Sequence, residues 1–423
     1  MHKRYSICVL AILLNIVPAF GNISSVDRCT VENSQKIYFA NYVRPLSESN
    51  YLRRCLLEVN SEPDVPWRLV IGGRDKIVLI EQGVIVSIID LHDSAAFSEY
   101  VIEPFLSSEY VLMGYLSCGS SPKTMRLYSL ANGTYLKVIE DRAVTTVGDW
   151  TTSFLPILGG DCVYFNDVAG YFGGYSMETG NVEYDFSGRG SEFTPGSFPV
   201  SPIAYSVSGD GTLYVAAMQQ TPREVIGYNL QEGLLWRIEV PSCGAVDISD
   251  NGAFVALGKF RNGISFVDGR TGEILSSFLQ NCRITFGPSE TPDRSGFSLS
   301  PNGRFIGATF APEDSSHFAP EENYLTCIDT HYPYSSQHVW AFSDCSLNSP
   351  RVMDVADNGT LLIRDSIAGG VQYILLSIFG EKLWEGEILL SSEVAELAYT
   401  GTGYIIGYLD EVLGEATFIE LGI

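Results

Sequence analysis

Short runs of apolar residues follow one another along most of the chain, separated by Gly, Asn, Asp and Ser. Examples, all rich in Val, Ile, Leu, Tyr or Phe, are residues 76–81, 84–91, 110–116, 126–130 and 162–166. No stretch sustains the period of about 3.6 residues that marks an amphipathic helix. The pattern therefore predicts strands joined by turns from residue 67 onward, and an all-β chain.

One hairpin pattern recurs, and its clearest copy is residues 248–258, with the sequence ISDNGAFVALG. Related copies lie at residues 207–216, 299–308, 355–363 and 399–407. The Asn-Gly or similar pair supplies the positive φ angles that a tight hairpin turn requires. Counting weaker versions, such turns fall near residues 73, 108, 160, 210, 251, 302, 358 and 402. This spacing matches the roughly 40–50 residues of one four-stranded propeller blade.

A second pattern follows each hairpin and consists of a strand, a Gly-containing turn and another strand. Residues 266–275 (FVDGRTGEIL) are the clearest case, and residues 175–182, 228–236 and 378–384 are similar. Each repeat then has four strands, and it cannot bury both faces of its sheet by itself. The sequence therefore predicts a β-propeller of seven or eight four-stranded blades, with eight favoured.

The end of the chain indicates how such a ring would close. The last repeat has strands at residues 396–407 and 416–421 but lacks a fourth strand. We expect an N-terminal strand at residues 36–43 to complete this blade, and another strand at residues 52–59. The predicted organisation is a signal peptide at residues 1–21, an N-terminal segment at residues 22–65 and the propeller at residues 66–423.

These two patterns resemble the repeats of the WD-like and PQQ-like (quinoprotein-type) β-propeller families, over about residues 67–423. Asp268, Thr271 and Gly272 match part of the PQQ-type D-x-x-T-G-x-x-x-W element, but Ser276 replaces its Trp. Other copies keep Trp236 or Trp384 and lose the Asp and Thr. Quinoprotein dehydrogenases of the methanol type need a pair of adjacent cysteines, which the chain lacks. The resemblance thus implies a structural relative with no cofactor.

The N-terminus has the features of a secretory signal. Lys3 and Arg4 precede an apolar run at residues 7–16, and residues 19–21 supply small residues for cleavage. The run is too short for a transmembrane helix, and Cys8 lies inside it, so no lipoprotein signal is present. We expect a monomer outside the cytoplasm, periplasmic or secreted, with no membrane insertion. The net charge of −24 disfavours a nucleic-acid partner.

Eight cysteines remain after residue 21, an even number that favours disulfides in an exported protein. They are Cys29, Cys55, Cys118, Cys162, Cys243, Cys282, Cys327 and Cys345. No C-x-x-C pair exists, so a zinc site has little support. Buried free thiols are the alternative interpretation.

Motifs that carry chemistry are few. His317, His331 and His338, with Asp329 between them, have no recognised metal-ligand spacing and fit surface positions better. Asp247, Asp250, Asp354 and Asp357 resemble a calcium pattern, but Asp at hairpin turns commonly binds its own backbone. No catalytic residue is predicted, and no metal site.

The longest loops are expected at the end of the blades opposite the tight turns. Residues 187–200, 283–295 and 311–323 are such insertions, and the aromatic residues in or next to them are candidates for binding: Phe193, Phe198, Phe286, Phe310 and Phe318. The alternative is that these aromatic residues only pack their own loops. The predicted function is a non-enzymatic binding or scaffold module for a protein or an extracellular glycan. The alternatives are a hydrolase or lyase acting on a polysaccharide or peptide, and an outer-membrane assembly scaffold.

Overall fold

The computed structural model describes residues 29–39, 55–59, 66–72, 76–90, 100–106, 110–117, 124–129, 135–140, 157–159, 162–166, 172–176, 182–185, 202–218, 224–229, 232–285, 296–313, 324–331, 337–341, 347–390, 395–410 and 413–423. Within these ranges the protein is built of β-strands, and no α-helix is present. No helix of the described residues is therefore available to cross a membrane. The prediction of an all-β chain is confirmed.

The first four sheets take their strands in chain order. Sheet 1 contains β2 (Cys55–Val59), β3 (Trp67–Gly72), β4 (Lys76–Glu81) and β5 (Val84–Asp90). Sheet 2 contains β6 (Tyr100–Leu106), β7 (Tyr110–Ser117), β8 (Thr124–Ser129) and β9 (Tyr135–Glu140). Sheet 3 contains β10 (Ile157–Gly159), β11 (Cys162–Asn166), β12 (Phe172–Ser176) and β13 (Val182–Asp185). Sheet 4 contains β14 (Pro202–Val207), β15 (Leu213–Met218), β16 (Glu224–Asn229) and β17 (Gly233–Glu239).

The last four sheets include two departures from this order. Sheet 5 contains β18 (Cys243–Ile248), β19 (Phe254–Lys259), β20 (Ile264–Asp268) and β21 (Ile274–Phe278). Sheet 6 contains β22 (Cys282–Ile284), β23 (Phe297–Leu299), β24 (Phe305–Pro312), β25 (Tyr324–Asp329) and β26 (Gln337–Ala341). Sheet 7 contains β27 (Pro350–Val355), β28 (Leu361–Ile367), β29 (Gly370–Leu376) and β30 (Lys382–Leu389). Sheet 8 contains β31 (Ala395–Tyr399), β32 (Gly403–Asp410), β33 (Glu415–Gly422) and β1 (Thr30–Tyr38).

All strand pairs within the described sheets are antiparallel, and the second strands of sheets 5 to 8 are buried over most of their length. Val255 and Leu257 on β19 pack with the core of sheet 4, whereas Ala256 between them packs with sheet 6. Successive side chains of a strand point to opposite faces, so a strand buried on both faces must be apolar throughout. This accounts for the continuous apolar runs in the sequence.

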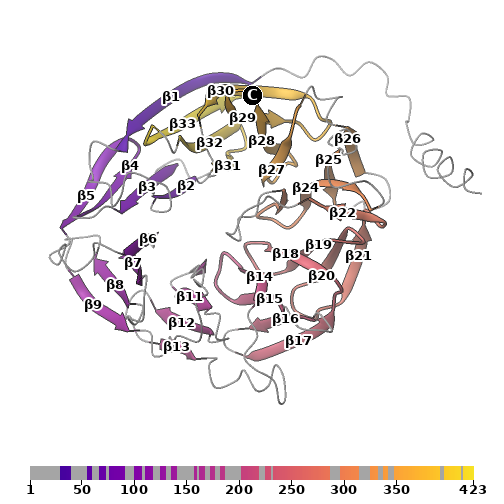
Figure 1. Cartoon of the computed structure of the whole chain (residues 1–423), viewed down its shortest axis with the longest axis horizontal. Helices are drawn as coiled ribbons and strands as arrows, with labels where there is room; N and C mark the ends of the chain where they lie inside the picture. The colour runs from indigo at the N-terminus through magenta and orange to yellow at the C-terminus, as the bar shows by residue number, and fades with distance from the viewer. Residues whose placement is uncertain are drawn as a thin grey trace, which may run out of the picture.

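Contacts join sheet 1 to sheet 2 and sheets 3 to 8 in chain order, and Figure 1 shows all the sheets following one another in this order, with sheet 8 beside sheet 1. The contacts join β2 to β6, β10 to β14, β14 to β18, β18 to β23, β23 to β27 and β27 to β31. The last sheet also contacts the first, through β31 and β2. The main contacts between sheets thus involve the first strands.

Sheet 8 combines the two ends of the chain. β1 pairs with β33 from Thr30 opposite Gly422 to Tyr38 opposite Glu415. The expected N-terminal strand is therefore present, but it spans Thr30–Tyr38 instead of residues 36–43. The second expected strand, at residues 52–59, is β2, and it belongs to sheet 1. Sheet 1 therefore starts at Cys55, within residues 22–65, which were predicted to form an N-terminal segment separate from the propeller.

Sheet 6 has a divided first strand. Both β22 and β23 pair with the same edge of β24, at Ile284 opposite Phe310 and at Phe297 opposite Ala308. The insertion predicted at residues 283–295 was expected to precede the first strand of this sheet. It instead lies between β22 and β23, the two parts of that strand. The physical reason is that residues on either side of the insertion find backbone partners on β24.

Candidate binding surface

The tight hairpin turns of sheets 4 to 7 lie together at one end of the sheets. The Asp210 amide donates to the Asp250 carbonyl (2.9 Å), and the Asp250 amide donates to the Pro301 carbonyl (2.8 Å). The Asn302 amide then donates to Asp357 Oδ1 (2.8 Å). We call this end the turn side. The opposite end, where the second strand connects to the third, is the loop side.

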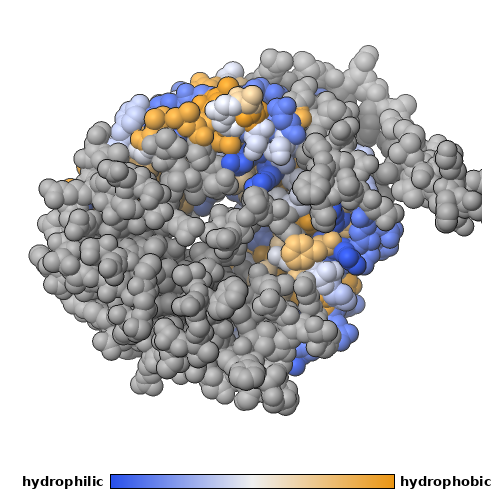
Figure 2. Space-filling model, in the orientation of Figure 1, coloured by the Kyte–Doolittle hydropathy of each residue, from blue (hydrophilic) through white to orange (hydrophobic). Residues whose placement is uncertain are grey.

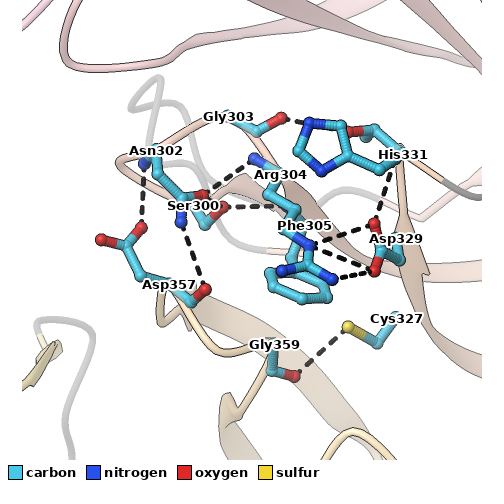
Figure 3. A network of polar contacts seen from close by, with 11 residues as sticks. Ser300, Asn302, Gly303, Arg304, Phe305, Cys327, Asp329, His331, Asp357 and Gly359 are labelled. Carbon is cyan, nitrogen blue, oxygen red and sulfur yellow. Dashed lines mark hydrogen bonds and ion pairs between the residues drawn. The ribbon is translucent and has the colours of Figure 1, made fainter. Parts of the chain in front are cut away.

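Each of these turns is held by its own polar side chains. In sheet 5, Asn251 Oδ1 accepts from the Ala253 amide (3.0 Å), and Ser249 Oγ accepts from the Phe254 amide (3.0 Å). Ser300 and Asn302 repeat this geometry in sheet 6, as Figure 3 shows. The interpretation of the recurrent motif as turn chemistry is supported by these contacts.

Asp247 and Asp354, the other members of the apparent calcium pattern, join neighbouring sheets. Asp247 Oδ2 accepts from the Leu299 amide of sheet 6 (2.8 Å), and its Oδ1 accepts from the Ile248 amide (3.0 Å). Asp354 likewise accepts from the Leu397 amide of sheet 8 (3.1 Å). Their oxygens are therefore occupied by backbone donors. Among the described residues no group of His, Cys, Asp and Glu is arranged to hold a metal ion.

The histidine group does not assemble in the described part of the chain. Asp329 accepts from Arg304 Nη2 (2.8 Å) and from the His331 backbone amide (3.0 Å), as drawn in Figure 3. The His331 side chain is exposed. His338 lies on β26, where only the backbone is described, and His317 lies outside the described residues. Asp329 thus serves an ion pair with Arg304.

Of the five phenylalanines predicted to bind a partner, only Phe310 can be placed. It is 5 % exposed, belongs to the core between sheets 5 and 6, and stacks on Tyr324 with ring centroids 5.5 Å apart. Its role is packing, because its ring has almost no surface left for a partner. Phe193, Phe198, Phe286 and Phe318 lie outside the described residues.

The cysteines with described side chains form no disulfide: Cys29, Cys243, Cys282 and Cys327 are free thiols. Burial raises the pKa of Cys282 to about 11, and burial also raises the pKa of Cys327 and Cys29. These thiols therefore stay protonated and are poor nucleophiles at neutral pH. Only the backbone of Cys55 and Cys162 is described, and Cys118 and Cys345 lie outside the described residues.

The loop side of sheet 5 has an unusual backbone. Ser242, Asn262, Leu279 and Asn281 all have positive φ angles, between 52° and 64°. The loops that carry them are tied together, since the Phe260 amide donates to the Ser242 carbonyl (2.8 Å) and the Gly263 amide to the Cys282 carbonyl (2.8 Å). Such conformations cost energy in residues other than glycine and often accompany functional sites.

Lys259 and Phe260 lie at the centre of these loops and have opposite environments. The Lys259 side chain is buried, 9 % exposed, and its ammonium donates to Ser265 Oγ (3.0 Å). Burial lowers the pKa of Lys259, although nearby Cys243 raises it slightly. Phe260, the next residue, is 48 % exposed. The loop side of sheet 5 therefore presents an exposed aromatic ring directly after a buried lysine in the sequence.

A second feature of the loop side is a group of exposed apolar side chains on sheets 7 and 8, which we call the leucine patch: Tyr38, Ile388, Leu390 and Leu413. Ile388 and Leu390 are each 58 % exposed, and Leu413 is 53 % exposed. Ile388 and Leu390 point to one face while Leu389 between them is buried. Figure 2 shows hydrophobic residues gathered over the region of β1, β30 and β33.

Asp410 holds the two leucines of the patch together. Its carboxylate is buried, accepting from the Leu390 amide through Oδ2 (3.2 Å) and from the Leu413 amide through Oδ1 (2.9 Å). The Phe39 amide donates to the Gly414 carbonyl (3.0 Å), which brings Tyr38 beside Leu413. A buried carboxylate thus fixes the backbone of two loops whose side chains face solvent.

An ion-pair network borders the patch. The Lys36 ammonium contacts Glu387 and Glu415, with its distance to Glu415 Oε1 being 2.9 Å. Burial opposes the charge, but these two carboxylates prevail and raise the pKa of Lys36. A hydrogen bond to Glu415 likewise raises the pKa of Tyr38. The network joins the outer strands β1 and β30, so the patch spans two sheets.

Sequence reasoning missed both features. The only sequence signal for the first was Lys259 and Phe260, which directly follow Gly258 and precede the Asn262-Gly263 pair. For the patch, Leu389 and Leu390 read as one apolar run, and their opposite exposure depends on the sheet.

No protein-family model matches the chain, and no curated protein matches it.

Proposed function

We propose that the chain is an eight-bladed β-propeller in which each sheet is one blade. Support comes from the number of sheets in the described residues, their antiparallel order and the contacts between first strands of sheets 1 and 2 and of sheets 3 to 8. The contact between β31 and β2, with the pairing of β1 and β33, would close the ring. A ring leaves no first or last blade with an unpaired face, which favours closure.

We further propose that this propeller is an exported, non-enzymatic, monomeric binding or scaffold module for a protein or an extracellular glycan. The observation that carries the proposal is that the loop side presents exposed apolar side chains on a backbone fixed by hydrogen bonds. Exposing such side chains costs hydration free energy, and rigid presentation lowers the entropy lost on binding. Both properties suit a recognition surface.

The loop side and the turn side offer a matched pair of variants. Phe260 on the loop side is 48 % exposed, and Phe379 in the β29–β30 turn is 49 % exposed. We expect affinity capture from extracytoplasmic fractions of the native host, together with a glycan array, to yield a specific partner. Phe260→Ala should weaken its capture, whereas Phe379→Ala should leave it unchanged.

Two results would overturn this function. Failure of the wild-type protein to retain any protein or glycan would remove the binding proposal. Cleavage of a polysaccharide or peptide by the purified protein, in the same fractions, would favour the alternative of a hydrolase or lyase. Selective retention of outer-membrane proteins would instead favour an assembly scaffold.

A further inference from the structure

The chemistry of the leucine patch distinguishes between a protein and a glycan. Three of the four members of the patch, Ile388, Leu390 and Leu413, expose only aliphatic side chains, which neither donate nor accept hydrogen bonds. The hydroxyl of the fourth, Tyr38, is hydrogen-bonded to Glu415. A glycan covers itself with hydroxyl groups, which would lose water against these side chains without gaining a partner. Apolar side chains of a protein gain from the same contact. The patch therefore suits a polypeptide.

The charge around the patch defines what flanks those apolar side chains. Glu387 and Glu415 border the patch and both pair with Lys36; the Glu387 side chain is half exposed, whereas Glu415 and Asp410 are buried. Among the described residues, the two carboxylates against one ammonium leave this ion-pair network negative, as is the whole chain at −24. A partner segment with basic residues is attracted, and a second copy of this chain is repelled.

The backbone geometry indicates that the patch is formed before a partner arrives. Asp410 binds the amides of both Leu390 and Leu413, so one buried side chain sets the separation of the two leucines. Lys36 fixes β1 against Glu387 and Glu415 at the other border. Binding then requires little further ordering of this protein.

We propose that the leucine patch is a docking site for a segment of a partner protein that combines apolar side chains with lysine or arginine. This inference rests on the proposed binding function and names the class of partner and the surface. The apolar side chains of the segment cover Ile388, Leu390 and Leu413. Its basic side chains lie over the acidic border.

The experiment uses the full chain and synthetic peptides of about twelve residues, measured by fluorescence anisotropy. The probe alternates Leu with Lys; a second peptide has Glu in place of Lys, and a third has Ser in place of Leu. We expect only the Leu/Lys peptide to bind, with affinity falling as salt rises because the charges are exposed. The double variant Leu390→Ser, Leu413→Ser should bind about tenfold more weakly.

Leu234→Ser is the matched control, because Leu234 is exposed on β17 near the turn side, away from the patch. It should retain wild-type affinity. Circular dichroism of all variants separates lost binding from lost folding. Since the patch leucines are exposed, their substitution should leave the unfolding midpoint nearly unchanged.

Several outcomes would overturn the docking site. Equal binding of the Leu/Glu or Ser/Lys peptide would show that apolar and basic groups are not both required. Preferential binding of an oligosaccharide would reassign the patch to a glycan, and a dimer that Leu390→Ser dissociates would reassign it to a second copy. If the double variant still captures the native partner, the docking site is wrong while the binding function stands.

Discussion

Glu396 on β31 and Val59 on β2 join the last sheet of the chain to the first. Glu396 Oε2 accepts a hydrogen bond of 3.0 Å from the Val59 amide. Asp247 makes the same kind of bond to Leu299 in the next sheet, and Asp354 makes it to Leu397. A carboxylate on the first strand of one sheet thus repeatedly satisfies a backbone amide on the next.

Glu396→Ala should lower the free energy of unfolding by about 1–2 kcal/mol, because it leaves the Val59 amide without this acceptor. Guanidinium denaturation followed by fluorescence measures the effect. Glu420→Ala is the control, since Glu420 accepts only an exposed bond from Asn33 at 3.4 Å. Equal losses in the two variants would contradict a special role for Glu396.

Asp247→Asn tests the same device where the carboxylate is more deeply buried. Both carboxylate oxygens accept backbone amides, and asparagine would point an NH₂ group at one of these donors. We expect a loss of about 1–3 kcal/mol. Asp357→Asn at the exposed turn should leave the free energy of unfolding nearly unchanged. The side-chain oxygen of asparagine can still accept the hydrogen bond from the Asn302 amide. An unchanged free energy of unfolding for Asp247→Asn would show that the hydrogen bond between the sheets contributes little to stability.

Lys259→Met should stabilise the protein at neutral pH by about 1 kcal/mol or more, since the buried ammonium makes one side-chain hydrogen bond and no ion pair within the described residues. Burial lowers the folded-state pKa of Lys259 below its ordinary value of 10.5. Between the folded-state pKa and 10.5, the unfolded state binds more protons than the folded state. The destabilisation caused by the buried ammonium therefore becomes smaller as pH rises.

The stability difference between wild type and Lys259→Met should therefore decrease from pH 7 toward pH 10.5. Comparing the difference, and not the absolute stability, removes the contribution of groups common to both proteins. Urea denaturation of both proteins at each pH provides the measurement. A difference independent of pH would mean that folding leaves the pKa of Lys259 unshifted.

Gly272→Ala should be strongly destabilising because Trp236 of the neighbouring sheet packs on this glycine. Trp236 Nε1 donates to the Gly269 carbonyl (2.7 Å), and a Cβ at Gly272 would lie 2.6 Å from Trp236 Cγ. Gly401→Ala is the control. Gly401 also has a positive φ, but a Cβ there would meet nothing within 4 Å.

The strain of a positive φ alone costs about 1–2 kcal/mol. Thermal unfolding should therefore show a much larger loss of midpoint temperature for Gly272→Ala than for Gly401→Ala. Similar losses would indicate that the contact with Trp236 adds nothing. In that case the Asp268-Thr271-Gly272 turn would matter only for its own conformation.

The repeat pattern was sufficient to predict the strands because turn chemistry and apolar runs are local. The side-chain oxygens of Ser249, Asn251 and their counterparts in sheet 6 accept amides of their own turns, so the sequence contains these contacts. The same holds for Asp268, which binds the amides of Arg270 and Thr271. The pairing of an N-terminal strand with the last sheet was also predictable, because a missing fourth strand leaves an edge to fill.

The candidate surfaces could not be predicted in this way, because exposure is set by residues distant in the sequence. Phe310 and Phe260 both occur close to the end of an apolar run. Phe310 stacks on Tyr324 and is 5 % exposed, whereas Phe260 is 48 % exposed. Leu389 and Leu390 are adjacent and identical, and only the orientation of β30 in sheet 7 buries one and exposes the other.

By itself, the sequence determined the all-β class, the repeat and its turns, since these depend on backbone conformations that Gly, Asn and Asp favour locally. The tertiary structure decided which side chains became core and which became surface. It also turned Asp247 and Asp354 from apparent metal ligands into acceptors for the next sheet, and made Asp410 the anchor of two exposed leucines. A buried carboxylate needs partners, and packing brings those partners from distant parts of the chain.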